Sequence, residues 1–186
     1  MAELRKLHLA EVSEADLNRW LEEMEEGSRR RIDAMSSLRR RKEAIAGDHL
    51  ARTALAEKSG KGPKEIVIRR TENGKPCAEE GAFSISHSGE WVVCALSEHP
   101  VGVDIEKRRR EPRRVAQCYF SEGEKRMLQQ DASAFWRIWT GKEALCKLTG
   151  EGIAALRRCD TSALPERVRL TTEHYEEYVI SLAEEI

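Results

Sequence analysis

The stretch FSISHSGEWVVCALSEHPVGVDIE, residues 83–106, contains three consecutive strand patterns and decides the fold. Residues 83–88 alternate between serines and larger side chains, so the serines share one face of the predicted strand. Residues 91–96 are continuously apolar, which is typical of a strand buried on both faces. Residues 101–106 alternate again. We therefore expect a sheet at the centre of this chain.

Two helices are predicted before these strands. Residues 12–27, VSEADLNRWLEEMEEG, have Ser13 as an N-terminal cap, an apolar stripe at helical spacing, and Gly27 where a C-terminal cap belongs. A longer and strongly basic stretch, about residues 29–58, is predicted as one second helix. The β-branched run EIVIR, residues 65–69, is predicted as a short strand.

Two more helices are predicted after the strands. Ser121 and Glu124 have the spacing of a capping box at the start of the first. Residues 133–150, SAFWRIWTGKEALCKLTG, form the second and most strongly patterned helix of this half. Two alternating runs at 167–170 and 177–183 are predicted as closing strands.

This order of elements favours an α+β fold. Helices and strands occur in both parts of the chain, which predicts two α+β halves of similar size, residues 1–99 and 100–186. The 186 residues suffice for one domain or two small ones, and the 40% hydrophobic content suffices for a real core.

Charge limits the class of partner. The 32 Lys and Arg residues nearly cancel the 33 Asp and Glu residues, which argues against a protein that coats nucleic acid. The basic residues are nevertheless bunched at 29–31, 39–42 and 107–110, so a local anionic ligand stays open.

Cysteine usage and hydropathy indicate the compartment. The five cysteines are odd in number and contain no C-x-x-C pair, which suits reduced thiols better than disulfides or a zinc site. The N-terminus has no apolar run of signal-peptide length, and no stretch approaches the roughly 18 apolar residues of a membrane span. We expect a cytoplasmic protein without a membrane partner.

Asp104 and Glu106 are the first candidate site residues. Alternation puts both on one strand face, about 6.5–7 Å apart, from where two carboxylates can lean toward one cation. A hard ion such as Mg²⁺ typically takes one or two protein carboxylates and completes its shell with water and phosphate oxygens. The competing interpretation is that two acids at a strand end face water.

The helix at 133–150 adds a third carboxylate. Glu143 and Lys147 lie four residues apart on one helix face, and Lys142 adjoins them. An ordinary surface pair of this kind contributes only about 0.2–0.5 kcal/mol. A magnesium–pyrophosphate site is the alternative: the glutamate would share the metal and the lysines would neutralise phosphate.

Two of these motifs together resemble a known family. VGVDIE at 101–106, followed by WTGKEALCK at 139–147, is similar to the signature of 4′-phosphopantetheinyl transferases. Four further segments fall in the family's order: AGDHLAR at 46–52, GKP at 74–76, FSISHSGEWVVCAL at 83–96 and YFSEGEK at 119–125. The mid-chain position of GVDIE resembles the Sfp-type branch, whose single chain contains two similar α+β halves, a pseudo-dimer. The part after Cys159 departs from the family pattern.

The resemblance implies an activity and its co-substrates. Family enzymes carry out Mg²⁺-dependent transfer of 4′-phosphopantetheine from coenzyme A to a serine of an apo acyl or peptidyl carrier protein, and they release 3′,5′-ADP. It also implies a monomer.

Site residues follow from the same resemblance, position by position. Asp104, Glu106 and Glu143 would hold Mg²⁺, and Glu143, Lys147 and Glu124 would be catalytic, with Glu124 as a base for the carrier serine. The residues implied in coenzyme A binding are Arg52, Lys75, Pro76, Ser86, His87, Lys142 and Lys147. Among these, His87 and Arg52 would contact the 3′-phosphate, and residues 39–42 are a further candidate there because guanidinium groups bind phosphate with paired hydrogen bonds.

Each assignment has a plainer alternative. His87 could be a buried, hydrogen-bonded histidine, residues 39–42 a solvated helix face, and Glu124 only the capping residue of its own helix. For the whole chain, the alternatives are an RNA-binding protein that uses its basic runs, or a catalytically inactive module that binds a carrier protein or coenzyme A.

Overall fold

The computed structural model describes residues 1–109, 111 and 113–186. The strands are β1 (Glu3–His8), β2 (Arg69–Arg70), β3 (Pro76–Cys77), β4 (Ala82–Ser88), β5 (Trp91–Ser97), β6 (Val101–Lys107), β7 (Val168–His174) and β8 (Tyr178–Glu185). The α-helices are α1 (Glu14–Glu23), α2 (Glu26–Asp33), α3 (Leu38–Ser59), α4 (Arg113–Tyr119), α5 (Glu122–Gln130) and α6 (Phe135–Thr149). Short 3₁₀ turns are η1 (Leu9–Glu11), η2 (Pro63–Glu65), η3 (Ala132–Ala134) and η4 (Ile153–Ala155).

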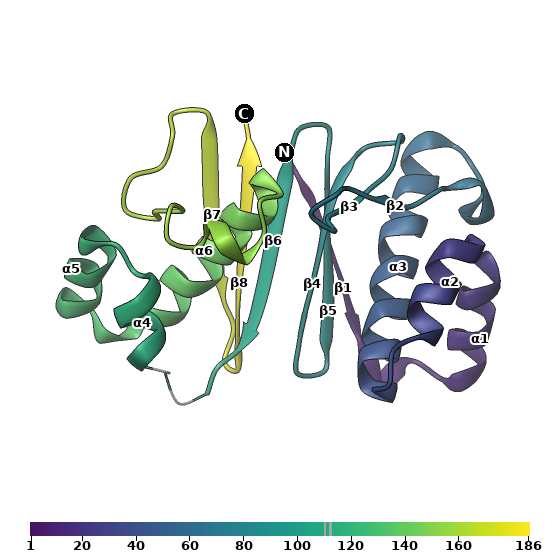
Figure 1. The fold of residues 1–186 in the computed structure, drawn as a ribbon, viewed down its shortest axis with the longest axis horizontal. Helices are drawn as coiled ribbons and strands as arrows, with labels where there is room; N and C mark the ends of the chain where they lie inside the picture. The colour runs from purple at the N-terminus through teal and green to yellow at the C-terminus, as the bar shows by residue number, and fades with distance from the viewer. Residues whose placement is uncertain (110, 112) are drawn as a thin grey trace.

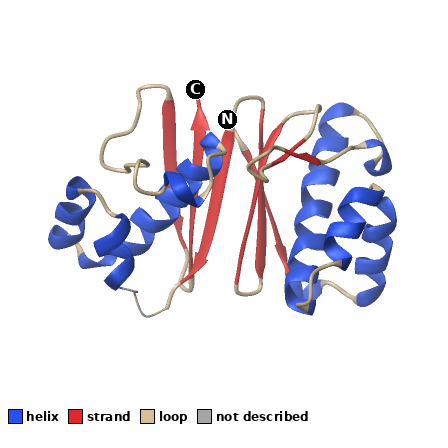
Figure 2. Cartoon of the chain, viewed as in Figure 1, coloured by secondary structure: helices blue, strands red, loops and turns tan. Residues whose placement is uncertain are grey.

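The elements form the α+β fold in two halves that the sequence predicts. The first half has an antiparallel sheet of order β1-β5-β4, and the second has one of order β6-β8-β7. The two sheets stand side by side at the centre, with α1–α3 on one outer flank and α4–α6 on the other (Figures 1 and 2). Residues 101–107 and 82–88 therefore meet at the middle of the molecule.

Strand β5 is the central strand of the first sheet and is buried on both faces, as its apolar run predicts. Val92, Cys94 and Leu96 pack into a core with α1 and α3. Val93 and Ala95 pack into a second core that lies between the two sheets. This second core joins the halves into one body.

In the first half, the predicted start of the first helix is confirmed, whereas its predicted end and the predicted single second helix are wrong. Ser13 and Asp16 form the expected capping box of α1. Gly27 is not a C-terminal cap, because α1 ends at Glu23 and Gly27 lies inside α2. The predicted single helix at 29–58 is two helices, since the Ser37 side chain accepts the backbone N–H of Arg40 and starts α3 anew.

Two strand predictions in the first half also need correction. In EIVIR only Arg69 pairs in a strand, while Ile66 and Ile68 are buried in the first core. Burial of these β-branched side chains, rather than sheet pairing, accounts for the pattern. Strand β1 was not predicted, because its charged residues interrupt the apolar positions of a partly exposed strand.

Gly102 allows α6 to lie directly on β6. A Cβ at this position would come within 2.0 Å of the Ala144 carbonyl oxygen and 2.4 Å of the Leu148 nitrogen. Only a residue without a side chain fits such a close approach. The contact brings the face of α6 that carries Glu143 and Lys147 over β6.

Three serines of β4 connect the halves at the edge strands of the two sheets. Their Oγ atoms accept backbone N–H groups from β6, so edge groups that lack a strand partner on that side are satisfied. The pairs are Val103 N–Ser84 Oγ (3.0 Å), Ile105 N–Ser86 Oγ (3.3 Å) and Lys107 N–Ser88 Oγ (3.0 Å). We call Ser84, Ser86 and Ser88 the serine row.

All five cysteines are free thiols. The structure nevertheless brings two of them together, since the Sγ atoms of Cys146 and Cys159 lie 3.1 Å apart. Among the described residues, no helix combines the length and the hydropathy needed to cross a membrane. Arg110, the last residue of the third basic run, lies outside the described residues.

Candidate metal and phosphate site

The three carboxylates singled out in the sequence come together in space. Asp104 and Glu106 extend from β6, Glu143 extends from α6, and one oxygen of each lies within 4.8 Å of the others. Asp104 is buried, whereas Glu106 and Glu143 are partly exposed. This all-oxygen donor set is the type that a hard divalent cation such as Mg²⁺ or Mn²⁺ takes.

The two oxygens of Asp104 have different surroundings. Oδ1 accepts hydrogen bonds from Ser86 Oγ and Lys147 Nζ, each at 2.8 Å. Oδ2 is buried and has no hydrogen-bond partner among the described residues. A buried carboxylate oxygen without a partner is costly in free energy, so it fits a group that receives a cation. The residues present therefore fit a divalent ion.

Glu143 titrates abnormally in this cluster. Burial, followed by the nearby Asp104 carboxylate, raises the pKa of Glu143 to about 8, although Lys147 opposes the shift. Without a cation, the shift favours the protonated form of Glu143, whose proton Asp104 can accept. The unpartnered Oδ2 of Asp104 is thus a feature of the fully ionised cluster. A divalent ion would displace that proton, because metal ligands must be deprotonated.

A pocket of about 250 Å³ opens beside the carboxylates. Glu143 and Lys147 line it from α6, and Lys75 and Pro76 line it from the start of β3. The Lys75 ammonium donates to the carbonyl of Leu148 at 2.9 Å, near the end of α6, and burial lowers the pKa of Lys75. Four predicted site residues thus share one cavity.

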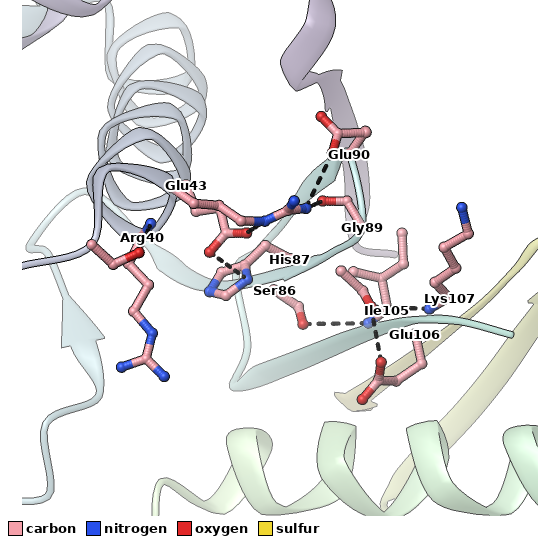
Figure 3. Close-up of polar contacts among 12 residues, drawn as sticks. Arg40, Glu43, Ser86, His87, Gly89, Glu90, Ile105, Glu106 and Lys107 are labelled. Carbon is pink, nitrogen blue, oxygen red and sulfur yellow. Dashed lines mark hydrogen bonds and ion pairs between the residues drawn. The ribbon is translucent and has the colours of Figure 1, made fainter. Parts of the chain in front are cut away.

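His87 and Ser86 point in opposite directions from β4 (Figure 3). Ser86 lies toward Ile105, in the interface between the halves. The His87 side chain is 50% exposed, and its Nδ1 is 3.4 Å from a carboxylate oxygen of the buried Glu43 on α3. His87 is therefore not a buried core histidine.

Glu124 and Lys142 form a buried ion pair of 2.7 Å, and neither side chain is exposed. The other carboxylate oxygen of Glu124 accepts the N–H and the hydroxyl of Thr161, and Glu124 completes the predicted capping box with Ser121. Lys142 directly precedes Glu143 in α6, so the two side chains leave the helix in different directions. The structure does not bring this pair to the carboxylate cluster, and the geometry gives their predicted site roles no support.

Arg52 is likewise held inside the first half. Its guanidinium is 1% exposed and pairs with Asp48 and Glu25, each at 2.9 Å. Since these carboxylates use its donors, the geometry gives no support to a phosphate contact.

The basic runs are partly neutralised within the protein. Arg39 pairs with the buried Glu43 at 3.0 Å, and Arg41 pairs with Asp33 at 2.8 Å. Arg40 is exposed and extends away from Glu43 (Figure 3).

Two residues of this region were not predicted. Ser88 donates to Glu106 Oε2 at 2.9 Å, and Glu43 contacts His87. Alternation puts Ser88 on the same face as Ser86, which was a usable signal. Nothing local in the sequence predicts that Glu43 of α3 reaches a residue of β4.

Comparison with known proteins identifies both halves. Residues 100–183 match a family model described as the 4′-phosphopantetheinyl transferase superfamily. Residues 11–99 match one described as 4′-phosphopantetheinyl transferase, N-terminal. Together the two models cover most of the chain.

Three similar proteins illustrate how much of this chain and of its relatives the similarity covers. The 4′-phosphopantetheinyl transferase gsp of Aneurinibacillus migulanus is 39% identical over 116 residues, which are 59% of this chain and 49% of that protein. Sfp of Bacillus subtilis (strain 168) is 32% identical over 59% of this chain and 53% of its own length. HetI of Nostoc sp. is 31% identical over 71% of this chain and 62% of its own. The chain thus spans about half the length of the first two relatives.

Proposed function

This chain belongs to the 4′-phosphopantetheinyl transferase superfamily, of the Sfp type, and we propose that it carries out the Mg²⁺-dependent transfer of 4′-phosphopantetheine from coenzyme A to a serine of an apo acyl or peptidyl carrier protein. The released product is 3′,5′-ADP. The observation that carries this proposal is the convergence of Asp104, Glu106 and Glu143 beside Lys147 and a pocket.

We assign the three carboxylates to Mg²⁺. Asp104 offers its unpartnered Oδ2, and Glu106 and Glu143 complete the protein's share of the ligands. Bound there, the ion would supply charge neutralisation for the pyrophosphate of coenzyme A.

The protein's own groups bind and orient the reactants. Lys147, whose side chain is 32% exposed, would neutralise phosphate charge, and the pocket walls at Lys75 and Pro76 would receive the nucleotide end. His87 remains our candidate for the 3′-phosphate, since its ring is half exposed. These contacts would act mainly by positioning, which can lower a barrier by several kcal/mol.

The chemical step is a substitution at phosphorus. The carrier serine oxygen would form a bond to the β-phosphorus, and the bond from that phosphorus to the bridging oxygen would break, with 3′,5′-ADP leaving. Glu143 is our candidate for the group that takes the serine proton, because it is partly exposed and lines the pocket. Glu124 is less suited, since it is fully buried in its ion pair.

The proposal also includes the division of the chain into two halves, its oligomeric state and its location in the cell. The division of the chain into two halves at residues 99/100 agrees with the boundary between the two matched models. A cytoplasmic location agrees with the five free thiols, which suit a reducing compartment. The monomeric state rests on the family resemblance.

A mass measurement tests the proposal. The protein would be incubated with coenzyme A, Mg²⁺ and an apo carrier protein, and the carrier should gain the mass of one phosphopantetheine. Asp104→Ala and Glu143→Ala should abolish the gain while the circular dichroism spectrum stays unchanged. Glu166→Ala, at an exposed loop position, is the matched control and should retain transfer.

The alternatives give different results. An RNA-binding protein would bind RNA in a salt-sensitive way that survives Asp104→Ala, and would leave the carrier unmodified. An inactive module would bind coenzyme A or the carrier without any mass gain. Full transfer by Asp104→Ala would refute the metal assignment.

A further inference from the structure

The serine row and strand β6 run in constant register. Each serine accepts a backbone N–H from the residue 19 positions further along the chain, at distances of 3.0 to 3.3 Å. The row therefore fixes how β6 of the second half lies along β4 of the first half. Both strands are edges of their own sheets, so this contact sets the register between the halves.

Two members of the row also contact the metal carboxylates. Ser86 Oγ donates to Asp104 Oδ1 at 2.8 Å, and Ser88 Oγ donates to Glu106 Oε2 at 2.9 Å. A hydroxyl has one proton and two lone pairs. Because the backbone N–H groups of β6 occupy a lone pair, the proton of each hydroxyl is left for the carboxylate.

These contacts fix the orientation of the Asp104 carboxylate through one of its two oxygens. Asp104 Oδ1 is held by Ser86 and by Lys147, so its other oxygen, Oδ2, is the one without a partner. The side chains of Ser86 and Asp104 are both buried, so water does not compete freely for these bonds.

We propose that Ser86 and Ser88 are positioning residues, which hold the carboxylates of Asp104 and Glu106 in the orientation that receives the divalent ion. The inference rests on the metal site of the proposed function. It assigns the hydroxyl of Ser86 to a carboxylate instead of a phosphate, and it gives Ser88 a role. It also makes the metal site a product of both halves, since the serines belong to the first half and the carboxylates to the second.

Ser84 is a control that the chain itself provides. It accepts the N–H of Val103 at 3.0 Å, as the other two serines accept theirs. The residue that corresponds to Asp104 and Glu106 at this step is Gly102, which has no carboxylate. Ser84→Ala therefore removes the register contact alone.

The test measures Mn²⁺ binding to the full chain without coenzyme A. Binding is monitored by the electron paramagnetic resonance signal of the free ion. Ser86→Ala and Ser88→Ala should each weaken Mn²⁺ binding about 10- to 100-fold, the usual effect of losing a group that orients a metal ligand. Ser84→Ala should bind Mn²⁺ like the wild type. Ser86→Ala and Ser88→Ala should each lower the urea midpoint somewhat more than Ser84→Ala, since each also loses a hydrogen bond to a carboxylate. Circular dichroism without urea should show all three variants folded, so unfolding does not account for the difference in Mn²⁺ binding. Ser88→Thr, which keeps the hydroxyl, should restore affinity.

Two results would overturn the inference in distinguishable ways. If Asp104→Ala loses Mn²⁺ while Ser86→Ala and Ser88→Ala bind it as Ser84→Ala does, the metal site stands and the positioning role falls. If the wild type binds Mn²⁺ no better than Asp104→Ala, the metal assignment fails and the inference fails with it.

Discussion

Replacing Gly102 by alanine should displace α6 from β6 and damage the metal site. An added Cβ would lie 2.0 Å from the Ala144 oxygen, whereas ordinary van der Waals contacts begin near 3.4 Å, so the helix backbone must retreat by about 1.4 Å. The atoms it meets are helix backbone, which cannot swing aside as a long side chain can. Gly102 does not have a positive φ, so the effect comes from the contact alone.

The expected cost has two parts. Overpacking of this kind typically lowers the free energy of unfolding by about 1–3 kcal/mol, and we expect the upper end because a whole helix must move. The same retreat would stretch the 2.8 Å contact between Lys147 and Asp104 and draw Glu143 away from the other carboxylates. Mn²⁺ affinity should therefore fall at least about tenfold, the size of loss seen when ligand orientation is disturbed.

Urea unfolding and Mn²⁺ titration measure the two parts separately. Gly27→Ala is the matched control, because the same substitution meets nothing within 4 Å in α2. It should raise the free energy of unfolding by about 0.5–1 kcal/mol, as alanine favours helices over glycine, and leave Mn²⁺ affinity unchanged. Wild-type stability and Mn²⁺ affinity in Gly102→Ala would refute the close contact of α6 with β6.

Three further predictions follow from buried groups. Because the pKa of Glu143 is raised from 4.5 to about 8, the metal-free protein holds a proton that the unfolded chain releases, and this group's contribution to stability is lost as the pH rises from 4.5 through about 8. Glu143→Gln should therefore gain stability over the wild type across that window in urea unfolding, and a constant difference would contradict the shift. Lys142→Met should lower the free energy of unfolding by about 3–5 kcal/mol, because it leaves the Glu124 carboxylate buried without its partner. Adding Glu124→Leu should recover part of this loss, and additive effects of the two substitutions would contradict the ion pair. Alkylation of the folded protein should label the exposed Cys77 early. It should not label Cys94 until the protein unfolds, because Cys94 is buried and burial raises its pKa to about 12. Early labelling of Cys94 would contradict its burial.

Local patterns in the sequence determined much of this protein. Strict alternation predicted β6 and the shared face of Asp104 and Glu106, because neighbouring side chains in a strand point to opposite sides. Capping residues predicted the starts of α1 and α5, because an N-terminal cap bonds within three residues of itself. The identities of the three carboxylates could also be read from the sequence.

Only the tertiary structure decided where long side chains find their partners. Lys142 lies one residue and Lys147 four residues from Glu143 in α6, yet Lys142 is buried against Glu124 and Lys147 reaches Asp104. Arg52 is of the residue type that binds phosphate, but its guanidinium is paired with acidic residues of its own half. Helical spacing gives the direction in which such a side chain leaves its helix. It does not give what lies there, because that depends on the register and packing of segments far apart in the chain, here on the serine row and on the space left by Gly102.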